Sequence, residues 1–149
     1  MTQLIIIAHA PLASALAAVG RHAFPEQSRS LTAIDVLPDD DMDGLEVQLR
    51  ELLARTEDAL LIADVFGATP GNVAARVVDG ARARLVYGAN VPLLWRVLNY
   101  LGKRSLPDLA ELAVSGAIQG VMTVAGGTRP QNQTSLKSHH DPDNSQDQQ

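Results

Sequence analysis

Two residues that can do chemistry stand at the ends of apolar segments. His9 follows the apolar run from Leu4 to Ala8, and Asp64 closes the segment ALLIAD at residues 59–64. A carboxylate beside an imidazole holds one ring nitrogen as a donor, leaves the other with a free lone pair and stabilises the cationic ring. Such a nitrogen can attack phosphorus directly. The two residues therefore predict nucleophilic catalysis by a histidine, if the fold brings them together.

The loop after Asp64 reads VFGATPGN and has the composition of an anion-binding helix start. Thr69 is the expected N-cap and Pro70 the first helical residue. The free N–H groups and partial positive charge of a helix N-terminus favour a phosphoryl group or another anion. Gly67 and Gly71 let the backbone come close to it, and the Thr69 hydroxyl can add a hydrogen bond.

Each of these residues also has an ordinary structural interpretation. A histidine at the end of a strand often only completes a local hydrogen bond, an aspartate there commonly caps a helix or shapes a turn, and TPGN is an ordinary helix start. Because the histidine, the aspartate and the helix start occur together at corresponding positions, we favour a catalytic role for them.

The other histidines and the large aromatic residues are weaker candidates. His22 lies near a helix end, where we expect a solvated or capping group, and His139 and His140 lie in a polar tail that offers no fixed third ligand. We therefore expect no metal. Trp95 and Tyr100 are interpreted as core residues or subunit contacts.

Short aliphatic runs alternate with helical periodicity along the chain. Proline, glycine or polar residues separate these segments, and Ser105 with Asp108 resembles a capping box before the last helix. The predicted strands are 4–8, 31–37, 59–64, 83–88 and a short edge strand at 120–124. The predicted helices are one from 11 to either 20 or 24, and those at 45–53, 70–78, 93–101 and 106–118.

Alternating strands and helices predict an α/β fold of three layers, with a mostly parallel sheet and helices on both faces. The usual order for such a sheet is 2-1-3-4. In that order the first and third strands are neighbours, so His9 and Asp64 meet in the crevice beyond the carboxyl ends of the strands. This adjacency is the step on which the chemical prediction depends.

Composition limits the classes of protein that fit. The chain has 149 residues, of which 46% are hydrophobic and 19% charged, which suits one domain with a sizeable core. We place that domain at residues 1–125 and interpret the polar segment 126–149 as a flexible tail. The absence of cysteine excludes a disulfide framework, a thiolate metal site and a thiol nucleophile.

The charge and the hydropathy of the chain argue against nucleic-acid binding and against membrane insertion. The formal net charge is −5 and no basic stripe is present, so a phosphate backbone has nothing to bind. No apolar run approaches the roughly 18 residues of a membrane span, and no basic segment precedes the first apolar run. We expect a cytoplasmic location.

Three segments, LIIIAHAPLASAL, ALLIADVFGATPGN and GANVPLL, resemble a known family when taken in this order. The chain is similar, from about Leu4 to Val124, to the IIA domain of the mannose family of the bacterial phosphoenolpyruvate-dependent sugar phosphotransferase system. The resemblance implies that His9 is phosphorylated on Nε2 while Asp64 hydrogen-bonds its Nδ1. It also implies a homodimer in which an antiparallel C-terminal edge strand, 120–124 here, crosses to the partner.

The resemblance assigns further residues to the site. Thr69 matches the hydroxyl residue before the family's proline, and Gly88, Asn90 and Pro92 match a turn in which Asn90 and Pro92 form the site rim. Two positions depart from the family pattern: Val65 replaces a frequent threonine, and Ala68 replaces the second glycine of the phosphoryl-binding loop formed by Gly67, Ala68, Thr69 and Gly71.

The function that follows is a phosphohistidine carrier without a cofactor. The expected donor is the phosphocarrier protein HPr, and the expected acceptor is a IIB component or a regulatory protein. Alternatives are a regulatory module that binds according to its phosphorylation state, or a IIA-like donor for dihydroxyacetone kinase. A small hydrolase that uses His9 and Asp64 as a dyad lacks an evident serine or metal.

Overall fold

The protein is built around a four-stranded parallel sheet. The structure is a computed structural model that describes residues 1–126. The strand order is β2-β1-β3-β4 and every neighbouring pair is parallel, which confirms the predicted order. The strands are β1 (Gln3–His9), β2 (Leu31–Val36), β3 (Ala59–Ala63) and β4 (Ala83–Tyr87).

The central strand β1 is buried on both sides of the sheet. Leu4, Ile6 and Ala8 face one apolar core, whereas Ile5 and Ile7 face the other. Successive side chains of a strand point to opposite faces, so a strand covered on both faces must be apolar at every position. This requirement explains the uninterrupted run that precedes His9.

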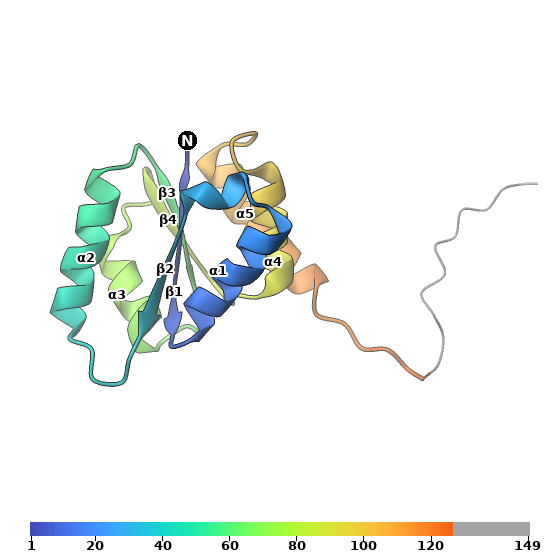
Figure 1. Ribbon diagram of the computed structural model, residues 1–149, viewed down its shortest axis with the longest axis horizontal. Helices are drawn as coiled ribbons and strands as arrows, with labels where there is room; N and C mark the ends of the chain where they lie inside the picture. Colours follow the sequence, from blue (N-terminus) through green and yellow to red (C-terminus); the bar gives the residue numbers. More distant parts are fainter. Residues whose placement is uncertain (127–149) are drawn as a thin grey trace, which may run out of the picture.

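Helices cover both faces of the sheet. Figure 1 shows α2 and α3 on one side, and α1, α4 and α5 on the other, with the sheet between them. This arrangement confirms the predicted three layers. The helices are α1 (Leu12–Ala23), α2 (Met42–Ala54), α3 (Thr69–Val77), α4 (Val91–Tyr100) and α5 (Leu106–Gln119), and a 3₁₀ turn, η1 (Gln27–Ser30), precedes β2.

Among residues 1–126, the side chain of the N-cap residue itself caps three of the helices. Asp41 accepts the backbone N–H groups of the first turn of α2, and Asn90 accepts the N–H of Leu93 in α4 at 2.8 Å. Ser105 accepts an N–H of α5, as one half of the predicted capping box requires. Each cap satisfies a donor that the helix itself leaves unpaired.

The predicted N-cap of α3 was wrong by one residue. Ala68 occupies the N-cap position and no side chain caps this helix, so Thr69 is its first residue. Pro70 lies in the first turn, where its missing N–H costs no hydrogen bond. The Thr69 hydroxyl is therefore not used in closing its own helix.

The edge strand predicted at 120–124 does not form within the single chain. After α5 the described residues run away from the body of the molecule (Figure 1), and Val121, Met122 and Val124 are largely exposed. A strand needs a neighbouring backbone for its hydrogen bonds, and within residues 1–126 this segment has none. All but the first residue of the predicted tail, 126–149, lies outside the described residues.

Candidate active site

His9 and Asp64 lie side by side, although 55 positions separate them in the chain. The Nδ1 atom of His9 is 2.6 Å from Oδ2 of Asp64. An ionised carboxylate only accepts hydrogen bonds, so Nδ1 carries the proton and Nε2 of the neutral ring keeps its lone pair. The His9 side chain is 55% exposed and that of Asp64 only 11%. The ring therefore presents its free nitrogen near solvent while the acid stays covered.

Three donors hold Asp64 in its ionised form. Burial works to raise the pKa of Asp64, but hydrogen bonds from the backbone N–H of His9, the His9 ring and the N–H of Val65 outweigh it. The pKa of this carboxyl consequently lies below its ordinary value. The acid is charged at neutral pH and can balance a positive charge on the ring.

Strand order produces this contact. His9 is the last residue of β1, and Asp64 comes directly after β3, the neighbour of β1. Further backbone bonds fix both ends: the N–H of Ala10 donates to Val36 O at 3.0 Å, and the N–H of Gly88 donates to Asp64 O at 3.1 Å. The loops that follow all four strands are thereby joined at one edge of the sheet.

Thr69 and His9 line the same cavity. This cavity has a volume of about 480 Å³ and is mostly apolar, with one carboxylate in its wall. Its lining residues are His9, Ala10, Val36, Leu37, Pro38, Asp40, Met42 and Thr69. A larger hollow of about 820 Å³ lies along β4 and α5 and contains none of the predicted site residues.

The two glycines of the loop have different local roles. Gly67 adopts a φ of 85°, in the left-handed region that favours glycine. A Cβ on Gly71 would lie 2.5 Å from the Tyr87 ring and 3.0 Å from Val65 O, so Gly71 lets α3 pack against β4. The N-cap Ala68 is extended. A contact of these residues with a phosphoryl group stays a prediction.

Asn90 and Pro92 serve the packing of α4 and α5. Besides capping α4, Asn90 donates from Nδ2 to Ala117 O at 3.3 Å, and Pro92 borders Gly120 at the end of α5. Neither residue lines the cavity that contains His9. Their assignment to the site rim stays a prediction.

The sequence interpretation missed a second acid that supports the site. Asp35 of β2 accepts the backbone N–H of Ser14 at 3.0 Å and its hydroxyl at 2.5 Å. Pro11 gives α1 no side-chain cap, and Asp35 supplies that cap from the neighbouring strand. The polar residue inside the predicted strand 31–37 was a signal of this role, because buried strands of parallel sheets are usually apolar.

The remaining candidates lie away from His9 or outside the described residues. His22 is exposed near the end of α1, whereas His139 and His140 fall in the part that the structure does not describe. Within residues 1–126 no three histidines or acids gather as metal ligands. Trp95 is 48% exposed, so it is not a core residue; its alternative interpretation as a subunit contact stays a prediction.

Fold and site together define a class of protein: a three-layer α/β domain with a histidine–carboxylate pair beyond the strand ends of its parallel sheet. The family described as "PTS system fructose IIA component" matches residues 3–114. The chain belongs to this family of phosphotransferase system components, which confirms the resemblance seen in the sequence. No curated protein matches the chain.

Solved structures share the fold. A phosphotransferase component EIIA from Streptococcus agalactiae aligns with a TM-score of 0.76 at 17% identity, over 83% of this chain and 97% of its own. A mannose/sorbose-specific IIA subunit from Enterococcus faecalis gives 0.75 at 20%, over 86% and 98%. A sigma-54 interaction domain protein from Enterococcus faecalis gives 0.64 at 15%, over 79% and 91%.

Among residues 1–126, none of the helices combines the length and the apolar character that a bilayer span requires.

Proposed function

We propose that the protein is a phosphohistidine carrier that accepts a phosphoryl group on Nε2 of His9. The observation that supports this most directly is the Nδ1–Oδ2 contact of 2.6 Å between His9 and Asp64. That contact places the proton on Nδ1 and leaves the exposed nitrogen nucleophilic. Membership of the IIA family supports the same reaction.

The transfer is a direct displacement at phosphorus. The lone pair of Nε2 forms a new N–P bond while the donor's N–P bond breaks, and the electron pair of that bond returns to the donor nitrogen. The His9 ring becomes cationic, and the charge of Asp64 compensates it. Position and electrostatics supply the catalysis, because such a transition state needs little covalent help from the protein.

Thr69 and the start of α3 form the proposed phosphoryl-binding side. Thr69 shares the cavity with His9, and its hydroxyl is not used as a cap. The N–H groups of the first turn of α3 carry the partial positive charge of the helix end. Gly67, Ala68 and Gly71 belong to the same proposed phosphoryl-binding loop.

Proteins are the proposed partners. The family suggests HPr as donor and a IIB component as acceptor in the cytoplasm, with no cofactor. We also propose a homodimer, in which residues 120–124 of one copy pair antiparallel with the open edge of β4 in the other. The apolar hollow beside β4 and the exposed side chains of Val121, Met122 and Val124 support that pairing.

A second candidate function is regulatory binding. In this alternative phosphorylated and free His9 present different charges to a kinase or transcription factor. The structural likeness to a sigma-54 interaction domain protein supports this regulatory alternative. The phosphorylation step is common to both candidates, so the first experiment tests that step.

The full chain is incubated with labelled phosphoenolpyruvate, enzyme I and HPr. We expect acid-labile, base-stable label on the wild type and none on His9→Ala. His22→Ala is the matched control and should label normally, since His22 is an exposed histidine on α1. Label retained in His9→Ala, or absent from the wild type, would contradict the carrier function. Addition of a IIB component then tests the acceptor.

A further inference from the structure

The outer face formed by α1 and α4 carries an unusual concentration of positive charge. Neither helix contains an aspartate or glutamate, although the whole chain has a formal charge of −5. We call this surface the basic face. It comprises Arg21 of α1, Trp95, Arg96 and Tyr100 of α4, and Lys103 and Arg104 just after α4.

The cations of the basic face are not neutralised by carboxylates of the described residues. Arg96 donates to the amide oxygen of Gln119 at 2.8 Å, and Lys103 donates to the carbonyl of Asn99 at 2.9 Å. Arg104 lies over the ring of Tyr100, 5.9 Å from its centroid. These acceptors are neutral, so the full charges remain available to a partner.

A shallow hollow lined by both polar and apolar side chains lies within this face. It has a volume of about 390 Å³, and its lining residues are Phe24, Pro92, Trp95, Arg96, Asn99 and Tyr100. Trp95 is a large side chain that the fold leaves 48% exposed. Tryptophan, tyrosine and arginine, which line or border this hollow, are the residues that most often dominate binding energy at protein interfaces.

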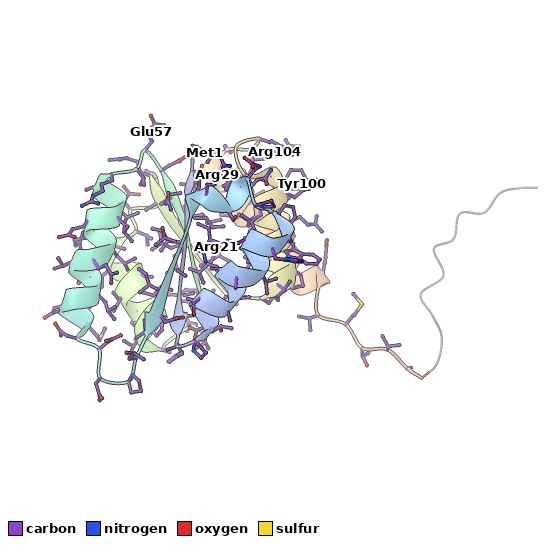
Figure 2. The ribbon with its side chains drawn as sticks, viewed as in Figure 1. Met1, Arg21, Arg29, Glu57, Tyr100 and Arg104 are labelled. Atoms are coloured by element: carbon purple, nitrogen blue, oxygen red, sulfur yellow. The ribbon has the colours of Figure 1, made fainter. Side chains whose placement is uncertain are left out.

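The face is separate from the phosphoryl-transfer site. Gly20 of α1 packs against Leu94 and Leu98 of α4, which places the two helices side by side. Figure 2 shows Tyr100, Arg104 and Arg29 near the end of the molecule where the N-terminus lies, whereas His9 ends β1 at the opposite edge of the sheet. The hollow on the basic face and the cavity that contains His9 share no lining residue, so a partner can occupy the basic face while His9 stays open.

We propose that the basic face docks an acidic protein segment with one aromatic or branched aliphatic side chain. The apolar side chain fills the hollow beside Trp95, and carboxylates on either side of it pair with Arg96 and Arg104. Charge complementarity supports this occupant. A recess takes a single inserted side chain, whereas nucleic acid needs a basic groove that follows its backbone. Asp108 and Glu111 line an adjacent hollow with Arg104 and Tyr100 and limit the basic face on the α5 side.

The test uses a fluorescein-labelled peptide with glutamates around a central Leu-Phe, and follows anisotropy with the full chain. We expect saturable binding that weakens as salt rises. Trp95→Ser and Arg104→Glu should each raise Kd about tenfold. Arg55→Glu is the matched control, because it makes the same charge change at the far end of α2, and its Kd should stay unchanged.

Four competing probes test whether another kind of partner fits the basic face better. They are the same peptide with lysines for glutamates, one with alanines for Leu-Phe, a labelled oligouridine and phosphatidylglycerol vesicles. Tighter binding of any of these, no saturable binding of the acidic peptide, or an equal loss in Arg55→Glu would overturn it. Self-association lost in Trp95→Ser would instead assign the face to a second copy. His9→Ala should bind the peptide normally, so this test is independent of phosphoryl transfer.

Discussion

One carboxylate oxygen of Asp64 holds His9 twice. Oδ2 accepts the backbone N–H of His9 at 2.9 Å and the ring Nδ1–H at 2.6 Å. Because both donors belong to one residue, the bonds fix the ring relative to its own backbone as well as to β3. The orientation of Nε2 and the tautomer of the ring thus depend on a single acid.

Asp64→Asn should slow phosphorylation of His9 with the fold intact. The amide has the size of the carboxylate but no charge to compensate the cationic ring, and its nitrogen can favour the wrong tautomer. We expect a loss of roughly 10²- to 10⁴-fold, by analogy with the acid of a serine-protease triad. Rapid-quench measurement of labelled protein gives the rate, and ¹⁵N shifts of the His9 ring give the tautomer. Asp58→Asn is the control; an unchanged rate in Asp64→Asn would refute the orienting role.

The contribution of Asp64 to stability should disappear in acid. Its pKa is lower in the folded protein than in the unfolded chain, so folding favours the ionised form. This contribution is complete above the unfolded value of about 4 and is lost as pH falls through the folded pKa. The difference in unfolding free energy between wild type and Asp64→Asn should therefore shrink below about pH 4. Urea unfolding at several pH values measures it, and a constant difference would contradict the prediction.

Removal of the Thr69 hydroxyl should weaken the phosphorylated state. A hydrogen bond to a charged group contributes about 1.5–3 kcal/mol, so Thr69→Val should shift the phosphotransfer equilibrium toward the donor by about tenfold or more. Thr69→Ser keeps the hydroxyl and should recover most of the loss. Equal equilibrium constants for the valine and serine variants would remove Thr69 from the site.

The Ser14–Asp35 cap should stabilise the domain. Ser14→Ala removes the hydroxyl that donates to Asp35 and leaves the backbone N–H bond in place, and we expect a loss of about 1 kcal/mol of unfolding free energy, the typical net contribution of one hydrogen bond. Ser115→Ala is the control, because that hydroxyl bonds only a carbonyl of its own helix. If the two variants unfold at the same urea concentration, the hydroxyl bond from Ser14 to Asp35 has no energetic role.

Residues 120–124 should determine the oligomeric state. Met122→Asp places a charge in the segment that is proposed to pair with β4 of another copy, and should turn a dimer into a monomer in sedimentation equilibrium. Val47→Asp puts the same charge on an exposed apolar position of α2 and should leave the dimer intact. Monomeric wild type would contradict the proposed exchange.

Local sequence signals determined most of the fold. The apolar runs before His9 and Asp64 specified strands buried on both faces, and proline, capping residues and apolar spacing placed the helix starts to within three residues. The sheet order followed because short right-handed crossovers leave few topologies for such elements. Strands and helix starts can be predicted in this way because the residues that determine them lie within a few positions of one another in the sequence.

Only the tertiary structure decided what distant residues do for one another. It brought Asp64 to His9 at hydrogen-bond distance, assigned Asp35 to cap α1 from another strand, and exposed Trp95 on a helix that reads as apolar. The segment 120–124 reads as a strand, yet it has no neighbouring strand among the described residues 1–126. Contacts of this kind depend on how strands and helices meet in space, which hydrophobic periodicity does not encode.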